Sequence, residues 1–218
     1  MEKTNEQLRA EVATLGKRHQ IIAKKILGKN SMWVVVAQYF RLFRHGLALG
    51  SNLALGFNQQ LDFIQASMTH DVVTSAGFGP ESMVRSWRFL QWFDDVEVEL
   101  EGLRDGGDEI LTAVTKTTVT ITTQTLRNLF PHLCGSEKGS RSAIVADKLV
   151  GQRVVMHGST GFTWDEASGR VSSVQAQSDM LTPVLHMLGS LDGVTHMFKS
   201  ALMHLNFQVR LAFVYPME

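Results

Sequence analysis

The first 28 residues carry an apolar pattern that repeats every seven residues, and it constrains the fold more than any other feature of the chain. The repeat has two rows, Met1, Leu8, Leu15 and Ile22 in one and Asn5, Val12, His19 and Ile26 in the other. Apolar side chains at this spacing form a stripe that a helix buries against a partner helix. A polar Asn within such a stripe fixes the register of the paired helices and favours a two-stranded coiled coil. We predict a coiled-coil helix over residues 1–28 whose dimerisation seam is formed by Asn5, Leu8, Val12, Leu15 and Ile22.

The same stripe has a second interpretation. Four heptads make a short stripe, and a helix in a protein owes most of its stability to the packing of its apolar face. The alternative is therefore an ordinary amphipathic helix that packs on its own domain. The two interpretations differ in what buries Leu8 and Leu15. The apolar stripe is consistent with both interpretations and does not distinguish between them.

Composition limits the class of protein. A chain of 218 residues with 44% hydrophobic content can form one sizeable domain with an appendage. Lys+Arg and Asp+Glu both number 21, so the whole chain gives no electrostatic case for binding nucleic acid. A single cysteine, Cys134, excludes an internal disulfide and fits a reducing compartment. The charged N-terminus and the short apolar runs predict a protein that is neither secreted nor inserted in a membrane.

The period of the apolar pattern changes near the middle of the chain. Helical spacing predicts helices over 33–47 and 57–73 and a helix that begins at Pro80. The glycine-containing stretch over 46–56 is predicted to be a turn, with a short helix within it as the alternative. Val and Glu alternate over 96–101, which predicts a strand with one wet face.

The second half of the chain is predicted to be mostly extended. A hairpin turn signal over 104–108 precedes a stretch over 109–126 in which Ile110, Val114, Val119 and Ile121 stand among polar Thr. A loop follows over 130–141. We predict further strands over 148–163 and 170–178, and helices over 179–205 interrupted near Gly189 and Gly193.

This order of elements predicts an α+β domain, because the helices and the hairpin strands are grouped separately along the chain. Alternating strands leave one face wet, so the helices must cover the other face of a bent antiparallel sheet. We expect a cone with an apolar interior over residues 31–205, preceded by the coiled-coil helix over 1–28. The tail over 206–218 has no assignable role.

Four blocks of the sequence resemble a known family. They are Gln38–Leu47, Val96–Leu103, Thr118–Thr122 continuing into Thr125–Leu133, and Leu149–Arg153 followed by Phe162–Asp165 and Ser178–Pro183. These blocks are similar to a family of basic leucine-zipper (bZIP) transcription-factor-like proteins of eukaryotic microbes. In that family a bZIP segment precedes a nuclear-transport-factor-2-like cone. The resemblance implies a dimer and a nuclear, regulatory setting, whereas composition alone indicates the cytoplasm.

The chain departs from that family in one respect. The family's pattern includes a basic helix ahead of the zipper, which reaches bases and phosphates in the major groove. Lys3 and Arg9 do not replace such a run. We therefore expect DNA contact only through a partner or through a basic region outside this sequence. The expected partners are a second copy or a complete bZIP protein, with a small apolar ligand in the cone and no membrane.

Cones of this type often hold a ligand, and some are isomerases or dehydratases. Such chemistry uses a carboxylate or a histidine in an apolar mouth, where burial moves its pKa toward neutrality. The candidate pocket residues are Tyr39, His70, Asp71, Trp87, Trp92 and His157. Each has a structural alternative: Tyr39 and the two Trp as core aromatics, the His70–Asp71 pair as a helix end, and His157 on either face of a strand.

The remaining motifs indicate neither a metal nor a cofactor. His132 and Cys134 lie close in sequence, but a zinc site normally needs three protein ligands. Gly77-Phe78-Gly79 lacks the strand and the further glycines of a phosphate loop. No catalytic residue is assigned. The leading hypothesis is a non-enzymatic transcription-regulatory protein, and the alternative is a small-molecule isomerase or dehydratase of the cone fold.

Overall fold

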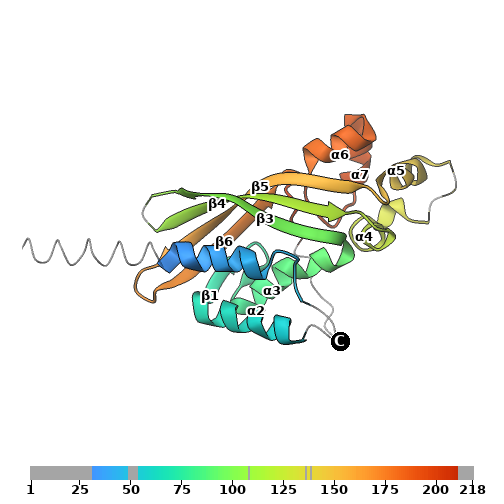
Figure 1. Ribbon diagram of the computed structural model, residues 1–218. Coiled ribbons are helices and arrows are strands. Elements are labelled where there is room, and N and C mark those ends of the chain that lie inside the picture. The colour runs from blue at the N-terminus through green and yellow to red at the C-terminus, as the bar shows by residue number, and fades with distance from the viewer. Residues whose placement is uncertain (1–30, 49–53, 108, 136, 138, 211–218) are drawn as a thin grey trace, which may run out of the picture.

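The computed structural model describes residues 31–48, 54–107, 109–135, 137 and 139–210 (Figure 1). The predicted coiled coil over 1–28, with its seam residues, lies outside the described residues. So does the end of the predicted tail, residues 211–218.

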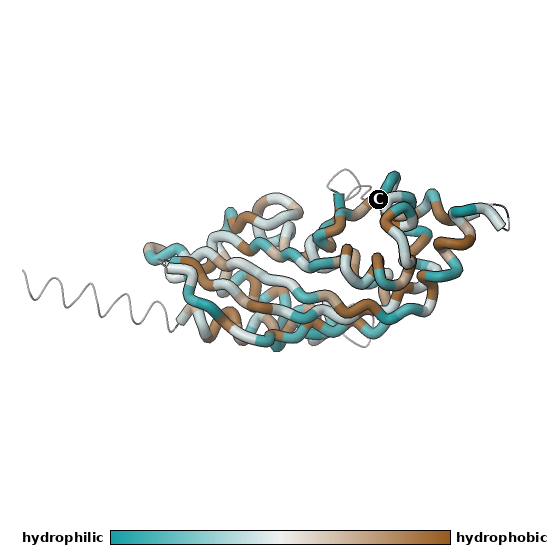
Figure 2. Tube along the Cα trace, turned by 90° about the horizontal axis from the view of Figure 1, so that it is seen from above, coloured by the Kyte–Doolittle hydropathy of each residue, from teal (hydrophilic) through white to brown (hydrophobic). Residues whose placement is uncertain are grey.

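A six-stranded sheet forms the body of the protein. Its strands are β1 (Met68–Thr74), β2 (Gly77–Phe78), β3 (Asp94–Asp105), β4 (Ile110–Thr120), β5 (Arg153–Asp165) and β6 (Arg170–Ser178). Their order across the sheet is β2-β1-β6-β5-β4-β3, and neighbouring strands are antiparallel except for the parallel pair β1–β6. The strands carry hydrophobic and hydrophilic residues in alternation (Figure 2), which gives the sheet a core-facing and a wet face.

Helices lie in two groups around this sheet (Figure 1). The described helical elements are residues 31–42, α2 (Ala54–Ser67), α3 (Pro80–Arg88), α4 (Thr123–Leu129), α5 (Arg141–Leu149), α6 (Leu181–Leu188) and α7 (Leu191–Phe198), with short 3-10 turns η1 (Phe89–Trp92) and η2 (Pro131–Leu133). The helix over 31–42, α2 and α3 form one group, and α4 to α7 gather at one end of the sheet. The α+β cone predicted from the sequence is confirmed.

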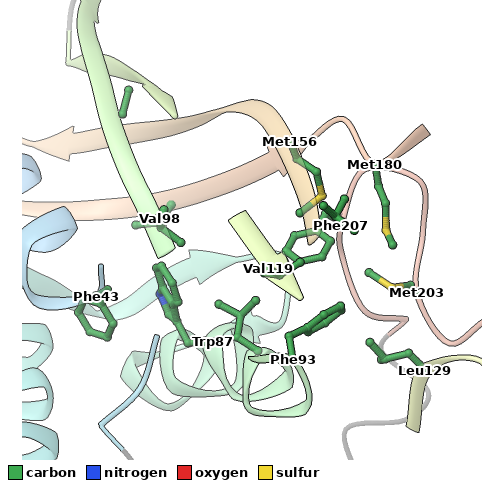
Figure 3. Packing of buried hydrophobic residues seen from close by; sticks show 14 of the residues in the cluster. Phe43, Trp87, Phe93, Val98, Val119, Leu129, Met156, Met180, Met203 and Phe207 are labelled. Carbon is green, nitrogen blue, oxygen red and sulfur yellow. The ribbon is translucent and has the colours of Figure 1, made fainter. Parts of the chain in front are cut away.

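The apolar interior of the cone lies between the first helix group and the sheet. Tyr39, Phe40 and Phe43 project from the helix over 31–42 and pack against Trp87 of α3 and Phe162 of β5. The rings of Phe43 and Trp87 stack with centroids 5.2 Å apart (Figure 3). Such contacts add to the stabilisation that comes from burying the rings.

Local sequence explains where α3 begins. Gly79 precedes it at φ +80°, a conformation that glycine adopts without strain. Pro80 then occupies the first turn, where a missing N–H costs nothing. Glu81 in the first turn and Arg88 in the last turn both complement the helix dipole. The predicted start at Pro80 is confirmed, and this start directs Trp87 into the core.

The helix predicted over 57–73 is wrong in its last part. α2 ends at Ser67, and Met68–Thr74 form β1, which pairs with β6 about a hundred residues further along the chain. Residues such as Val72 and Val73 suit an extended chain because they branch at Cβ. Because the apolar residues in α2 have helical spacing, the prediction from the sequence extends the helix past Ser67 into β1.

Two further predictions are corrected at helix starts. The extended stretch predicted to reach residue 126 ends at Thr120, because the side chain of Thr122 accepts from the backbone N–H of Thr125 and caps α4. The end of the loop and the beginning of the strand predicted from 148 are replaced by α5, which Ser140 caps in the same way.

The cone continues beyond residue 205. Met203 and Val209 form an isolated antiparallel bridge, and Phe207 between them is buried against the body. The first part of the predicted tail is therefore packed structure. Within the described part of the chain, no helix combines the length and the apolar character required to cross a bilayer.

Candidate functional site

A pocket opens between the helix over 31–42, α3 and the inner faces of β4, β5 and β6. The space that the centres of water molecules can occupy in it is about 90 Å³. Its lining residues are Tyr39, Phe40, Ser75, Ser86, Trp87, Phe89, Leu90, Val98, Thr115, Thr117, Thr160, Val174, Ala176, Gln177, Ser178, Asn206, Phe207 and Gln208.

Tyr39 and Trp87 form a hydrogen-bonded pair in the wall of this pocket. Trp87 Nε1 donates to the phenol oxygen of Tyr39 over 2.8 Å, and both side chains are buried. Burial raises the pKa of the Tyr39 phenol above its ordinary value, and this effect exceeds the opposite effect of the Trp87 hydrogen bond. Tyr39 therefore stays neutral across the physiological range.

The wall provided by the sheet carries three buried threonines. Thr115 and Thr117 are alternate residues of β4, and Thr160 lies on β5 opposite Ala113, so all three point to the inner face. Their exposed fractions are 3%, 5% and 5%. None of the three hydroxyls bonds to a described residue, and none is enclosed in protein: all three side chains line the pocket, where water or a ligand can reach the hydroxyls.

Gly158 lets the end of β6 come close to β5 beside Thr115. It stands directly opposite Thr115 in the β4–β5 register, so a side chain there would point to the same face. A Cβ at this position would overlap the carbonyl oxygen of Gln177 and come within 2.6 Å of Ser178 Oγ. The end of β6 thus approaches β5 closely where β5 has no side chain.

The segment after α7 closes one end of the pocket. The backbone N–H of Ser178 donates to the Asn206 carbonyl over 3.0 Å, and Gln208 Nε2 donates to the Ala176 carbonyl over 2.5 Å. Phe207 lies between Asn206 and Gln208 in the sequence, and its ring centroid is 5.2 Å from that of Phe89. Figure 3 shows Phe207 beside Phe93, at a centroid distance of 5.6 Å.

Of the six candidate residues from the sequence, the structure brings together Tyr39 and Trp87 at the pocket. Trp92 lies in η1 outside the lining, and its carbonyl oxygen accepts from the hydroxyls of Thr122 and Thr125.

The other three candidates face solvent. The side chains of His70 and Asp71 on β1 are 96% and 70% exposed. The side chain of His157 is 72% exposed and lies 3.5 Å from Glu101 on the neighbouring part of the sheet. These three do not converge on the pocket.

The chemistry that the pocket offers is uncharged. Every lining side chain is neutral at physiological pH, including Tyr39, the one ionisable group among them. Hydroxyl and amide groups provide hydrogen bonds on one side, and aromatic rings provide apolar contact on the other. Within the described residues, no group of three potential metal ligands comes together. This arrangement suits binding of a small molecule.

The chain also resembles known proteins, although a search of curated proteins finds no match. Three similar solved structures are TsrD from Streptomyces laurentii (14% identity, 72% of this chain and 97% of that chain, TM-score 0.44), a SnoaL-like polyketide cyclase from Agrobacterium tumefaciens (14%, 71% and 95%, TM-score 0.46) and an NTF2-like protein from Burkholderia pseudomallei (11%, 74% and 98%, TM-score 0.43). At this level of similarity the likeness concerns the fold alone.

A family model matches one segment of the chain. Residues 33–93 match the BZIP transcription factor 1 C-terminal domain. The segment runs from the helix over 31–42 to the end of η1, and it contains both Tyr39 and Trp87. This part of the chain is therefore similar to the C-terminal domain of BZIP transcription factor 1.

Proposed function

We propose that this protein is a transcription regulator of bZIP type in which the cone is a ligand-binding module. The observation that carries the proposal is the position of the pocket: Tyr39 and Trp87, which line it, belong to the segment that matches the bZIP-associated domain. The heptad pattern of residues 1–28 supports dimerisation through a zipper. In this proposal the protein acts in the nucleus, and contact with DNA comes from a partner or from a basic region outside the sequence.

The lining of the pocket favours binding over isomerase or dehydratase chemistry. General acid–base catalysis is most effective when the pKa of the catalytic group lies near the working pH. Burial moves the pKa of Tyr39 away from that range. His70, Asp71 and His157, the groups that could have served, point into solvent.

The zipper is tested by the oligomeric state of the full chain. The double variant Leu8→Glu, Leu15→Glu places charge in the proposed seam and should sediment as a monomer, whereas the parent sediments as a dimer. The control is Ala13→Glu, Gln20→Glu, which adds the same charge outside the seam and should remain dimeric. A seam variant that sediments like the parent overturns the zipper.

The pocket is tested with a neutral aromatic probe. Naphthol should bind the full chain with one-to-one stoichiometry in calorimetry. Thr115→Phe places a ring in the pocket and should abolish this binding, while Thr195→Phe, on the exposed side of α7, should retain it. Circular dichroism verifies that both variants are folded. Equal binding by the parent and Thr115→Phe places the probe elsewhere and overturns the binding role of the pocket.

A further inference from the structure

The three unpartnered hydroxyls of Thr115, Thr117 and Thr160 specify one side of any ligand. These hydroxyls face the pocket and have no partner among the described residues, so their hydrogen bonds are available to water or to a ligand. A ligand that displaces this water must replace those hydrogen bonds, because a hydroxyl left without a partner is unfavourable. Here three of them lie together on the inner face of β4 and β5. A bound molecule with hydrogen-bonding groups along one edge would satisfy them.

The opposite side of the pocket specifies the rest of the ligand. Tyr39, Phe40, Trp87 and Phe207 present aromatic surface there. Flat rings pack well against such surfaces. The phenol of Tyr39 accepts from Trp87 and keeps its own proton, because its pKa is raised. It can therefore donate one hydrogen bond to a ligand.

Because the pocket lining is neutral, we expect the ligand to be uncharged. An ion that moves from water into a site without an opposite charge loses a large hydration free energy. Hydrogen bonds to neutral groups compensate only part of this loss. No side chain of the lining carries a charge that could compensate a carboxylate or an ammonium group. The pocket thus discriminates against charged molecules by the composition of its wall.

Taking the binding role proposed above as its basis, we propose that the pocket recognises an uncharged aromatic molecule with a hydroxyl or carbonyl group on one edge. The threonine hydroxyls hold that edge, and the aromatic wall holds the ring. The pocket is small, with about 90 Å³ open to the centres of water molecules. We therefore expect a ligand of no more than one or two rings.

Three probes of nearly equal shape test the proposal. Naphthol carries a hydroxyl, methylnaphthalene carries an apolar group, and naphthoate carries a charge on the same two-ring body. Their affinities for the full chain are measured by equilibrium dialysis. The variants are Thr115→Val, Thr117→Val and Thr160→Val, each of which removes one hydroxyl and keeps the shape of the side chain.

Thr69→Val is the matched control. Thr69 on β1 also has a hydroxyl without a partner among the described residues, but this hydroxyl is enclosed in protein and Thr69 does not line the pocket. Its substitution removes the same chemical group outside the pocket. Naphthol affinity should be unchanged in this variant.

The expected order of affinity is naphthol first, then methylnaphthalene, then naphthoate. At least one valine variant should weaken naphthol binding by about two- to tenfold, the value of a neutral hydrogen bond, and leave methylnaphthalene binding equal or stronger. Methylnaphthalene or naphthoate binding as tightly as naphthol, with valine variants that do not discriminate, overturns the ligand class and keeps the pocket as a binding site. Failure of all three probes to bind the parent overturns the proposed binding role, and the ligand class with it.

Discussion

Trp87 Nε1 donates a 2.8 Å hydrogen bond to the phenol oxygen of Tyr39 across 48 positions of the sequence. The bond joins the helix over 31–42 to α3, the two helical elements that form the aromatic side of the pocket. It is enclosed by Phe43, whose ring stacks on Trp87, and by Phe162, whose edge meets Tyr39. The stability of the first helix group and the shape of the pocket therefore depend on the same contact.

Removing the phenol hydroxyl should destabilise the fold. Tyr39→Phe leaves the N–H of Trp87 buried without its acceptor, which should lower the free energy of unfolding by about 1–3 kcal/mol. The measurement is urea denaturation of the parent and the variant. A double-mutant cycle with Trp87→Phe isolates the bond, since removing both partners should cost less than the sum of the two single changes. Additive effects would assign the loss to packing alone.

The same residue should affect stability in alkali. The pKa of Tyr39 is raised by burial in the folded protein, so its contribution to stability is fully present below about pH 10, the ordinary value for tyrosine. Above that value the unfolded state loses the proton first. The stability that the parent holds over Tyr39→Phe should then shrink by up to about 1.4 kcal/mol per pH unit. Urea midpoints from about pH 9 to about pH 11 test this, and a constant difference between the two proteins would contradict it.

Position 158 should not accept a side chain. Gly158→Ala places a Cβ within 2.6 Å of Ser178 Oγ and against the backbone of β6, so we expect a loss of about 1–3 kcal/mol in unfolding free energy. Gly161→Ala on the same strand is the control, because its nearest neighbour outside the adjacent residues, the carbonyl oxygen of Gln175, is 4.0 Å away. Thermal denaturation of both variants gives the comparison. Equal melting temperatures would show that β6 moves away at little cost.

An apolar substitution should stabilise β1. Thr69→Val removes a buried hydroxyl that has no partner among the described residues, and the free energy of unfolding should rise by about 1–3 kcal/mol. Thr74→Val on the same strand should do the opposite, because the Thr74 hydroxyl bonds to Ser82 and to the backbone of Ala76 and Gly77. Denaturant unfolding of both variants and the parent gives the unfolding free energies that test this prediction. A destabilised Thr69→Val would mean that the hydroxyl has a partner.

The fold class could be predicted from the sequence because its signals are local. The Val and Glu alternation of β3 and the hairpin that follows it depend on neighbouring residues, and so does the start of α3 at Pro80. β1 could not be predicted in this way because its main partner is β6, which pairs with it in parallel from far along the chain. A strand stabilised mainly by such a distant partner leaves little trace in a window of ten residues.

The site could be predicted only in part, for a related reason. Tyr39 and Trp87 stand out in the sequence as large aromatics with a polar atom, and both line the pocket. The sequence pattern places the threonines of β4 in the polar part of a mixed stretch, whereas Thr115 and Thr117 share the inner face with Leu111 and Val119, and Ile110 is exposed. A threonine fits either face of a strand by shape, so its presence does not indicate which face is inside.

The order in which the pocket is completed follows from the position of Phe207 in the sequence. All six strands and α3 leave the ribosome before residues 203–210, so the sheet and the aromatic side can assemble while Phe89 and Phe93 still lack their neighbour. A nascent chain at that stage leaves the rings of Phe89 and Phe93 without their contact to Phe207. When residues 203–210 emerge, Phe207 packs against Phe89 and Phe93 and covers this end of the pocket.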